Sequence, residues 1–151
     1  MKVIKIGGKE YKFEFTIEAS LYDECTVNVT SLLEGLGSAK ENKDTKSMIS
    51  SLANIPQTAL SMFYAGLLEH HGEDGDGSIA NKKEAKKLIK KFFDEHKEDG
   101  KGNFYEIMEM MLGVMEEDGF FELIGLSQVL EPKKQKKVPQ DHKKPEKAIA
   151  K

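Results

Sequence analysis

Apolar and polar positions alternate in the first fifteen residues, and a glycine pair divides them into two runs. The apolar positions are Val3, Ile4, Ile6, Tyr11, Phe13 and Phe15. The Gly7-Gly8 pair can supply the positive φ angles that a tight primed turn requires. The pattern predicts a β-hairpin with its three aromatic side chains on one face. A lone hairpin is marginal in water, so we expect this face to pack on helices.

From residue 16 onward the apolar positions recur with helical spacing. They are Ile17, Leu21, Cys25, Val29, Leu32, Leu33 and Leu36. Thr16 is a candidate N-cap, and Gly35 and Gly37 are expected to end the helix. Residues 25–30 also alternate and contain β-branched side chains, so a strand or a break is an alternative there. The longer periodic window favours a helix.

The middle of the chain predicts a short helix and then a long one. The short helix contains Met48, Ile49 and Leu52, with Asp44 or Thr45 as its cap. Pro56 interrupts it and can occupy the first turn of the next helix, where a missing N–H costs little. That next helix has the clearest apolar stripe in the chain. The stripe consists of Leu60, Phe63, Tyr64, Leu67, Leu68 and His71.

Two further helices follow glycine-containing turns, and each opens with a capping-box pattern. The pairs are Asn81 with Glu84 and Asn103 with Glu106. The first helix has an apolar face of Ala85, Leu88, Ile89, Phe92 and Phe93, and a basic face of Lys82, Lys83, Lys86, Lys87, Lys90 and Lys91. The apolar face of the second consists of Phe104, Ile107, Met108, Met111, Leu112 and Met115. A short apolar helix is expected at residues 120–124.

Charge separates an acidic body from a basic end. Residues 132–151 contain eight lysines and two acidic residues, a net charge of +6, so the rest of the −3 chain carries −9. This segment has too few apolar residues to offset its ordering entropy, and we expect it to be disordered. The sequence therefore predicts a mainly α (α+β) domain over residues 1–131, with the hairpin packed on a bundle of about five helices, and a Lys/Pro-rich tail over 132–151.

The single cysteine and the lack of long apolar segments predict a cytoplasmic protein. Cys25 excludes an intrachain disulfide, which fits a reducing compartment. The N-terminus lacks the apolar run of a signal peptide, and no stretch approaches the roughly 18 apolar residues of a membrane span.

Candidate chemistry along the chain is weak, and we expect no enzyme activity, cofactor or metal. The turn at residues 72–77 resembles part of a calcium-binding loop, but that register puts Gly72 at the first ligand position and Lys83 at the last. His70 and His71 are adjacent, so their side chains diverge on a helix. Cys25 lies on an apolar stripe, where a thiol is usually inert packing. Acidic neighbours dilute the lysine face of residues 82–91, which we interpret as a solvated surface.

The methionines are the most suggestive candidates for binding. Methionine side chains are pliable and suit surfaces that accept varied partners, although most of them are normally part of a core. Met110 lies off the main apolar stripe and is the best candidate for an exposed contact. The residues that we single out for partner binding are Met108, Met110, Met111, Met115, Phe120 and Phe121.

Four segments, in this order, resemble the tail assembly chaperones of long-tailed phages and prophages of Gram-positive bacteria. They are residues 6–13, 55–71, 104–111 and 117–121. The resemblance implies a non-enzymatic chaperone that coats the tape measure protein, assists assembly of the tail tube, and is absent from the mature virion. It also implies a longer, frameshifted form that recruits the tail tube protein. Lysine pairs in the tail are compatible with a slippery run of adenines, and self-association is possible.

A different class of function also fits the charge pattern. The basic tail could bind a polyanion, so a small regulatory or nucleic-acid-binding protein is the alternative hypothesis. The acidic body makes nucleic acid the less favoured partner.

Overall fold

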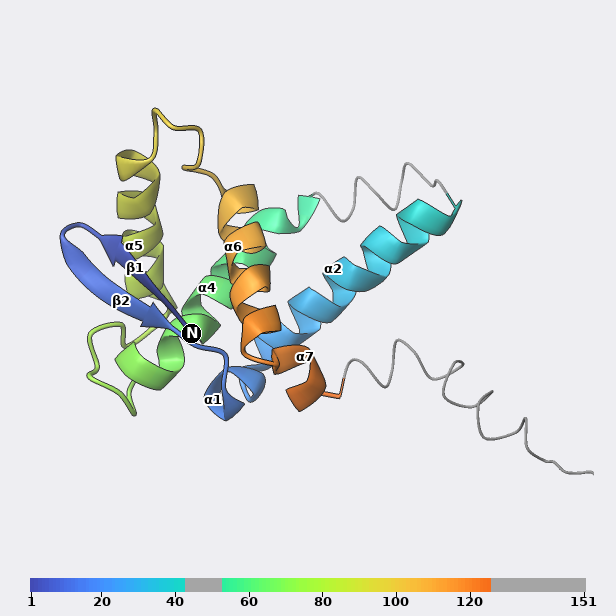
Figure 1. Ribbon diagram of the computed structural model, residues 1–151, viewed down its shortest axis with the longest axis horizontal. Coiled ribbons are helices and arrows are strands. Elements are labelled where there is room, and N and C mark those ends of the chain that lie inside the picture. Colours follow the sequence, from blue (N-terminus) through green and yellow to red (C-terminus); the bar gives the residue numbers. More distant parts are fainter. Residues whose placement is uncertain (43–52, 126–151) are drawn as a thin grey trace, which may run out of the picture. The chain divides into compact units, whose positions relative to one another are not determined.

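The protein is mainly helical with an N-terminal two-stranded antiparallel hairpin, which confirms the predicted fold class. The computed structural model describes residues 1–42 and 53–125 (Figure 1). Its elements are β1 (Lys2–Ile6), β2 (Lys9–Phe13), α1 (Ile17–Ser20), α2 (Asp23–Asn42), α4 (Ile55–His71), α5 (Lys82–Glu95), α6 (Phe104–Glu117) and α7 (Phe120–Leu123). The short helix expected at residues 48–52 and the basic tail lie outside the described residues.

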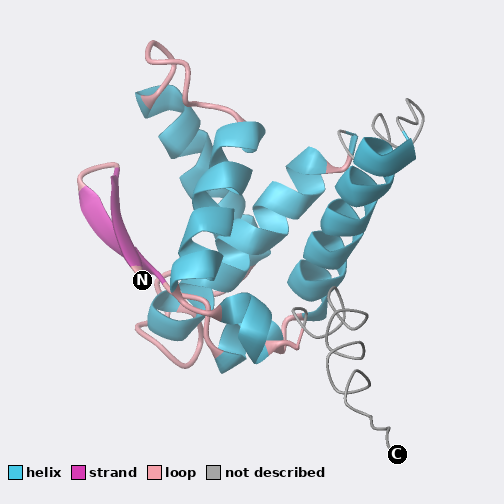
Figure 2. Ribbon diagram, turned by 45° about the vertical axis from the view of Figure 1, so that its right-hand side comes forward, coloured by secondary structure: helices cyan, strands magenta, loops and turns pink. Residues whose placement is uncertain are grey.

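The hairpin has the turn and the buried face that its sequence predicts. Gly7 and Gly8 both have positive φ angles, 61° and 80°, as a two-residue primed turn requires. Ile6 pairs with Lys9, and the ladder continues to Lys2 and Phe13. Its buried side chains are Ile4, Ile6, Tyr11 and Phe13, and Phe15 beyond β2 is buried as well. Figures 1 and 2 show the hairpin beside the helices, where β1 contacts α5 and β2 contacts α4.

Helix α4 is the centre of the fold. It contacts α1, α2, α5, α6 and β2. Pro56 lies in its first turn, as predicted. The predicted stripe is partly right, since four of its residues are buried but Tyr64 and Leu68 are only half-buried. Side chains between its positions are buried as well, including Ala59, Met62 and Ala65. A helix that is apolar nearly all round is one that neighbours cover on several sides.

The helix predicted from residue 16 is in fact two helices. The chain turns at Leu21 and Tyr22 between α1 and α2, and both Ile17 and Leu21 are exposed rather than part of an apolar stripe. Asp23 lies in the first turn of α2, where a negative charge favours a helix start. Thr16 is the N-cap residue of α1, as predicted, but its side chain makes no capping hydrogen bond. Its hydroxyl instead donates to Glu69 over 2.7 Å.

Helix α2 resolves one open question and corrects one prediction. Residues 25–30 are helical, so the strand alternative is wrong. The helix does not end at Gly35 and Gly37 but continues to Asn42. Glycine lowers helix stability by about 1 kcal/mol without preventing a helix, and good helix formers such as Ala39 and Lys40 follow.

Both predicted capping boxes form their first hydrogen bond. The Asn81 side chain accepts from the backbone N–H of Glu84 over 3.0 Å, and Asn103 accepts from Glu106 over 2.9 Å. These bonds satisfy N–H groups that the first turn of a helix leaves unpaired. The starts of α5 and α6 are therefore fixed locally by sequence.

Chain contacts group residues Met1–Phe120 into one compact unit and place Phe121 at the start of a second. Helix α7 begins at Phe120, as predicted for a short apolar helix at residues 120–124. The domain boundary predicted at residue 132 lies beyond the described residues. Among the helices that the structure describes, none is long and apolar enough to cross a membrane.

Candidate functional site

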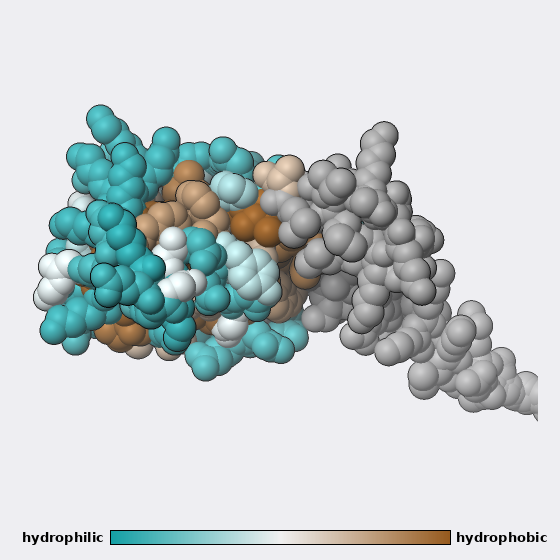
Figure 3. Space-filling view, turned by 90° about the horizontal axis from the view of Figure 1, so that it is seen from above, coloured by the Kyte–Doolittle hydropathy of each residue, from teal (hydrophilic) through white to brown (hydrophobic). Residues whose placement is uncertain are grey.

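An open hollow lies where α4, α5 and the start of α6 meet, with a volume of about 260 Å³. Helix α4 contributes Pro56, Gln57 and Leu60 to its lining. Helix α5 contributes Lys86, Ile89, Lys90 and Phe93, and α6 contributes Phe104. We call this hollow the three-helix groove. In Figure 3 apolar residues gather among hydrophilic ones on the face of the molecule seen from above.

The groove has an apolar floor and a basic edge. The rings of Phe93 and Phe104 meet edge to face with centroids 5.0 Å apart, and both side chains are half-buried. Lys86 and Lys90 are exposed, and neither has an ion-pair partner among the described residues. The combination suits a ligand with an apolar anchor and negative charge.

Two other lysines of α5 are already paired. Lys82 donates to Glu24 over 2.8 Å and so ties α5 to α2, and Lys87 pairs with Glu84 on its own helix over 3.2 Å. Lys91 lies against the hairpin turn, because its Cδ would be 3.1 Å from a Cβ placed on Gly7. The predicted basic face thus contains two paired lysines, two lysines at the groove, and Lys83 and Lys91, which lie outside the groove lining.

A second hollow, of about 300 Å³, has the opposite charge. It is lined by Glu18, Tyr64, Leu68, Glu73, Asp74 and Ala80. Burial raises the pKa of the Tyr64 hydroxyl, and the negative charge of Glu73 raises it further. Tyr64 is therefore neutral at physiological pH, and the charge of this hollow comes from its carboxylates.

The structure places most of the predicted partner-binding residues in the core. Met108, Met111, Met115 and Phe120 are buried, and each is at most 4% exposed. Met110 and Phe121 are half-buried. A partner could not reach the four buried side chains without opening the fold. Partner binding by these residues stays a prediction, and burial favours a packing role for four of them.

His71, Asp76 and Ser78 lie together but lack the geometry of a catalytic triad. His71 Nε2 accepts the backbone N–H of Lys12 over 2.9 Å, so it cannot take a proton from a nucleophile. His71 Nδ1 lies 3.1 Å from both Asp76 Oδ2 and Ser78 Oγ. The Ser78 hydroxyl donates to Asp76 Oδ1 over 2.6 Å. This cluster therefore holds the turn after α4 and anchors β2.

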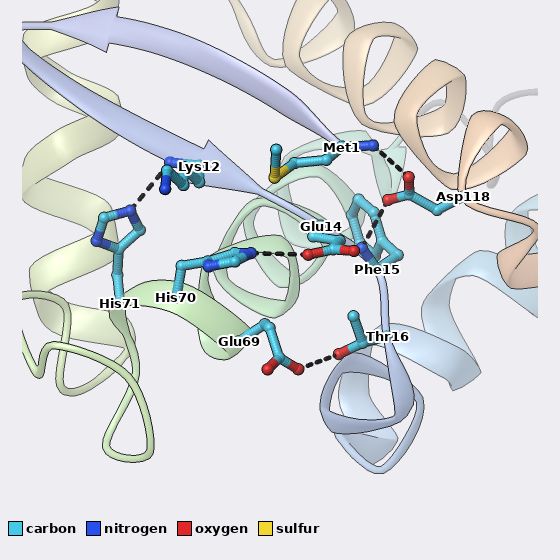
Figure 4. A network of polar contacts seen from close by, with 9 residues as sticks. All are labelled: Met1, Lys12, Glu14, Phe15, Thr16, Glu69, His70, His71 and Asp118. Carbon is cyan, nitrogen blue, oxygen red and sulfur yellow. Dashed lines mark hydrogen bonds and ion pairs between the residues drawn. The ribbon is translucent and has the colours of Figure 1, made fainter.

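Further polar contacts hold the end of the hairpin against the helices (Figure 4). His70 Nε2 donates to Glu14 over 2.7 Å. The His70 side chain is half-buried, whereas that of His71 is buried. The two histidines diverge, as predicted. Asp118, the C-cap residue of α6, accepts the Phe15 N–H over 2.8 Å and pairs with the N-terminal ammonium of Met1. The polar contacts drawn in Figure 4 are thus hydrogen bonds and ion pairs that hold the fold together.

No group of three or more potential metal ligands occurs among the described residues. In the turn after α4, Asp76 accepts from both the hydroxyl and the N–H of Ser78, and these bonds lower the pKa of its carboxyl to about 2. Cys25 is fully buried, and burial raises the pKa of its thiol to about 12. A thiol with so high a pKa stays protonated, which makes it a poor nucleophile.

His71 makes the stability of the fold dependent on pH. Burial lowers the pKa of its imidazole below 6.5, so protonation of His71 is less favourable in the folded chain than in the unfolded chain. Its contribution to stability is present above pH 6.5 and is lost as the pH falls through the folded pKa. The loss is at most about 1.4 kcal/mol per pH unit for one proton.

Urea unfolding of the wild type and of His71→Gln at pH 7.5 and pH 5.5 tests this prediction. The glutamine oxygen can still accept the Lys12 N–H but does not titrate. We expect the wild type to lose more stability than the variant between the two pH values. Equal losses in the two proteins would show that His71 does not cause the pH dependence.

Comparisons with models of protein families, with curated proteins and with solved structures gave no match to this chain. The resemblance to tail assembly chaperones therefore rests on the four sequence segments alone. The three-helix groove was missed by sequence analysis, although its aromatic and basic residues had been placed on α5 and α6. The pattern of apolar and charged residues on each single helix does not indicate where three packed helices leave a groove between them.

Proposed function

We propose that this protein is a phage tail assembly chaperone that binds the tape measure protein and assists assembly of the tail tube without catalysing a reaction. The observation that carries the proposal is the ordered similarity of four segments, above all Ile55–His71, to that family. This segment is the helix at the centre of the fold. The proposed partners are the tape measure protein and, through a frameshifted longer form, the tail tube protein.

The physical features of the described residues are compatible with this role. A chaperone for a largely helical partner needs an accessible surface that takes an amphipathic helix. The three-helix groove offers an apolar floor and unpaired basic side chains. The polar cluster most similar to a catalytic site, around His71, is instead occupied by structural hydrogen bonds. The proposed location is the host cytoplasm during assembly, before the virion is complete.

Co-expression with the tape measure protein of the same genome tests the proposal. We expect the tape measure protein to stay soluble and to co-purify with the chaperone. Expressed alone, it should aggregate, because its apolar helical faces lack a cover. An unrelated acidic helical protein serves as the control for nonspecific solubilisation. A tape measure protein that is equally soluble with either partner would contradict the proposal.

The alternative is a regulatory protein that binds nucleic acid through the eight lysines of residues 132–151. Such binding should weaken steeply as the salt concentration rises, since it depends on counterion release. It should also vanish when residues 132–151 are deleted. Salt-dependent DNA binding lost on that deletion, together with no effect on the tape measure protein, would favour the alternative.

A further inference from the structure

We propose that the three-helix groove is the docking site for an acidic amphipathic helix of a protein partner. One large apolar side chain of that helix enters the hollow, and its carboxylates meet Lys86 and Lys90. The inference deepens the proposed function and rests on it only for the identity of the partner. The chemistry of the occupant follows from the groove itself.

The size of the hollow favours a side chain over a small molecule. Pockets for cofactors and small ligands typically span about 300–1,000 Å³, and this open hollow has about 260 Å³. Its floor includes Leu60 and Ile89, which are 9% and 3% exposed and belong to the core. An inserted leucine or phenylalanine would therefore contact packed apolar atoms. The removal of its apolar surface from water would supply most of the free energy of binding.

The charge at the edge of the groove selects an acidic occupant. Lys86 and Lys90 have no ion-pair partner within the described ranges, whereas Lys82 and Lys87 do. An incoming carboxylate therefore need not displace an existing one. Elsewhere on the same unit, the hollow bounded by Glu18, Glu73 and Asp74 repels an acidic helix. Of these two hollows of the described residues, the groove is therefore the one whose charge attracts the proposed occupant.

The spacing of the two lysines favours a helix as the occupant. Positions four residues apart on α5 are separated by about 6 Å along its axis and lie on one face. A second helix alongside presents acidic residues at i and i+4 with the same spacing. Its apolar residues at i+3 or i+7 then face the floor, as in other complexes of a helix in a groove.

Two synthetic 18-residue peptides with N-terminal fluorescein test the inference on the full-length protein. Both are helical and carry the same leucine face, but one has glutamate and the other lysine on its remaining face. We expect the acidic peptide to bind at least about tenfold more tightly than the basic one in fluorescence anisotropy. The Lys86→Glu/Lys90→Glu variant should weaken its binding by about tenfold, since two attractions become repulsions.

Matched variants separate the groove from general electrostatics. Lys83→Glu/Lys91→Glu makes the same charge change on the same helix away from the groove and should leave the affinity within about threefold of the wild type. Gln57→Trp puts a large side chain at an exposed position of the lining and should reduce binding without changing charge. Far-UV circular dichroism confirms that each variant is folded.

Equal binding of the acidic peptide to the two charge-reversed variants would overturn the inference, and so would undetectable binding to the wild type. Neither result bears on co-purification of the tape measure protein, which tests the proposed function separately. If the tape measure protein co-purifies equally well with Lys86→Glu/Lys90→Glu and with the wild type, the proposed docking site is wrong while the proposed function stands. Loss of co-purification with this variant, together with normal co-purification with Lys83→Glu/Lys91→Glu, would support both the docking site and the proposed function.

Discussion

Replacing Phe120 with alanine is expected to lower the free energy of unfolding by about 3–5 kcal/mol, as for other large-to-small changes in a core. Phe120 is fully buried, and its ring meets that of Phe15 edge to face with centroids 5.4 Å apart. Its removal leaves a cavity beside a second fully packed aromatic ring. Because domains are stable by about 5–15 kcal/mol, the urea midpoint should fall strongly.

The neighbouring Phe121→Ala variant is the control for this prediction. Phe121 is only half-buried, so its loss should cost about 1 kcal/mol, near the average for point mutations. A small effect of Phe120→Ala on urea unfolding, combined with loss of tape measure binding, would instead make Phe120 a contact residue. That outcome would restore the sequence-based prediction that this aromatic pair binds the partner.

Replacing Gly66 with alanine is expected to destabilise the fold, although alanine normally stabilises a helix. A Cβ at Gly66 would lie 3.1 Å from Phe15 Cζ and 3.2 Å from Phe13 Cδ1. These rings cannot easily retreat, since both are buried and Phe13 packs edge to face on Phe63 with centroids 4.9 Å apart. Overpacking costs about 1–3 kcal/mol, against a gain of about 1 kcal/mol in helix propensity. We therefore expect a net loss of up to about 2 kcal/mol in the free energy of unfolding, measured in urea.

Gly113→Ala provides the matched comparison in α6. Gly113 is exposed, and nothing lies within 4 Å of a Cβ placed on it. Alanine should therefore raise stability there by about 0.5–1 kcal/mol through helix propensity alone. The two Gly→Ala changes are expected to have opposite signs. Stabilisation by both would mean that β2 and α4 can move apart without cost.

Local patterns predicted those elements whose causes lie within a few residues. The Gly7-Gly8 turn and the Asn81 and Asn103 caps depend on backbone geometry that neighbouring residues satisfy directly. Burial of alternate hairpin residues follows from the two-residue period of a strand. The apolar face of α5 follows likewise from the 3.6-residue period of a helix, with only Phe93 half-buried rather than buried.

Features that depend on distant segments were not predictable in this way. The burial of α4 on several sides results from five elements packing on it, whereas its own sequence predicts a single apolar stripe. The break after α1 depends on tertiary contacts such as the edge-to-face packing of Tyr22 on Tyr64, with centroids 5.3 Å apart. The three-helix groove likewise exists only because three helix surfaces meet incompletely. The apolar periodicity of one helix does not show how it packs against the others.

Helix α4 also seals one side of the hairpin against unwanted strand pairing. The outward N–H groups of Lys12 and Glu14 are donated to His71 Nε2 and to the Gly66 carbonyl over 2.9 Å each. An exposed strand edge is a template for aggregation and for β-augmentation by another chain, and donors already engaged cannot serve it. Another polypeptide therefore cannot extend the sheet through the N–H groups of Lys12 and Glu14, and recognition there must proceed through side chains.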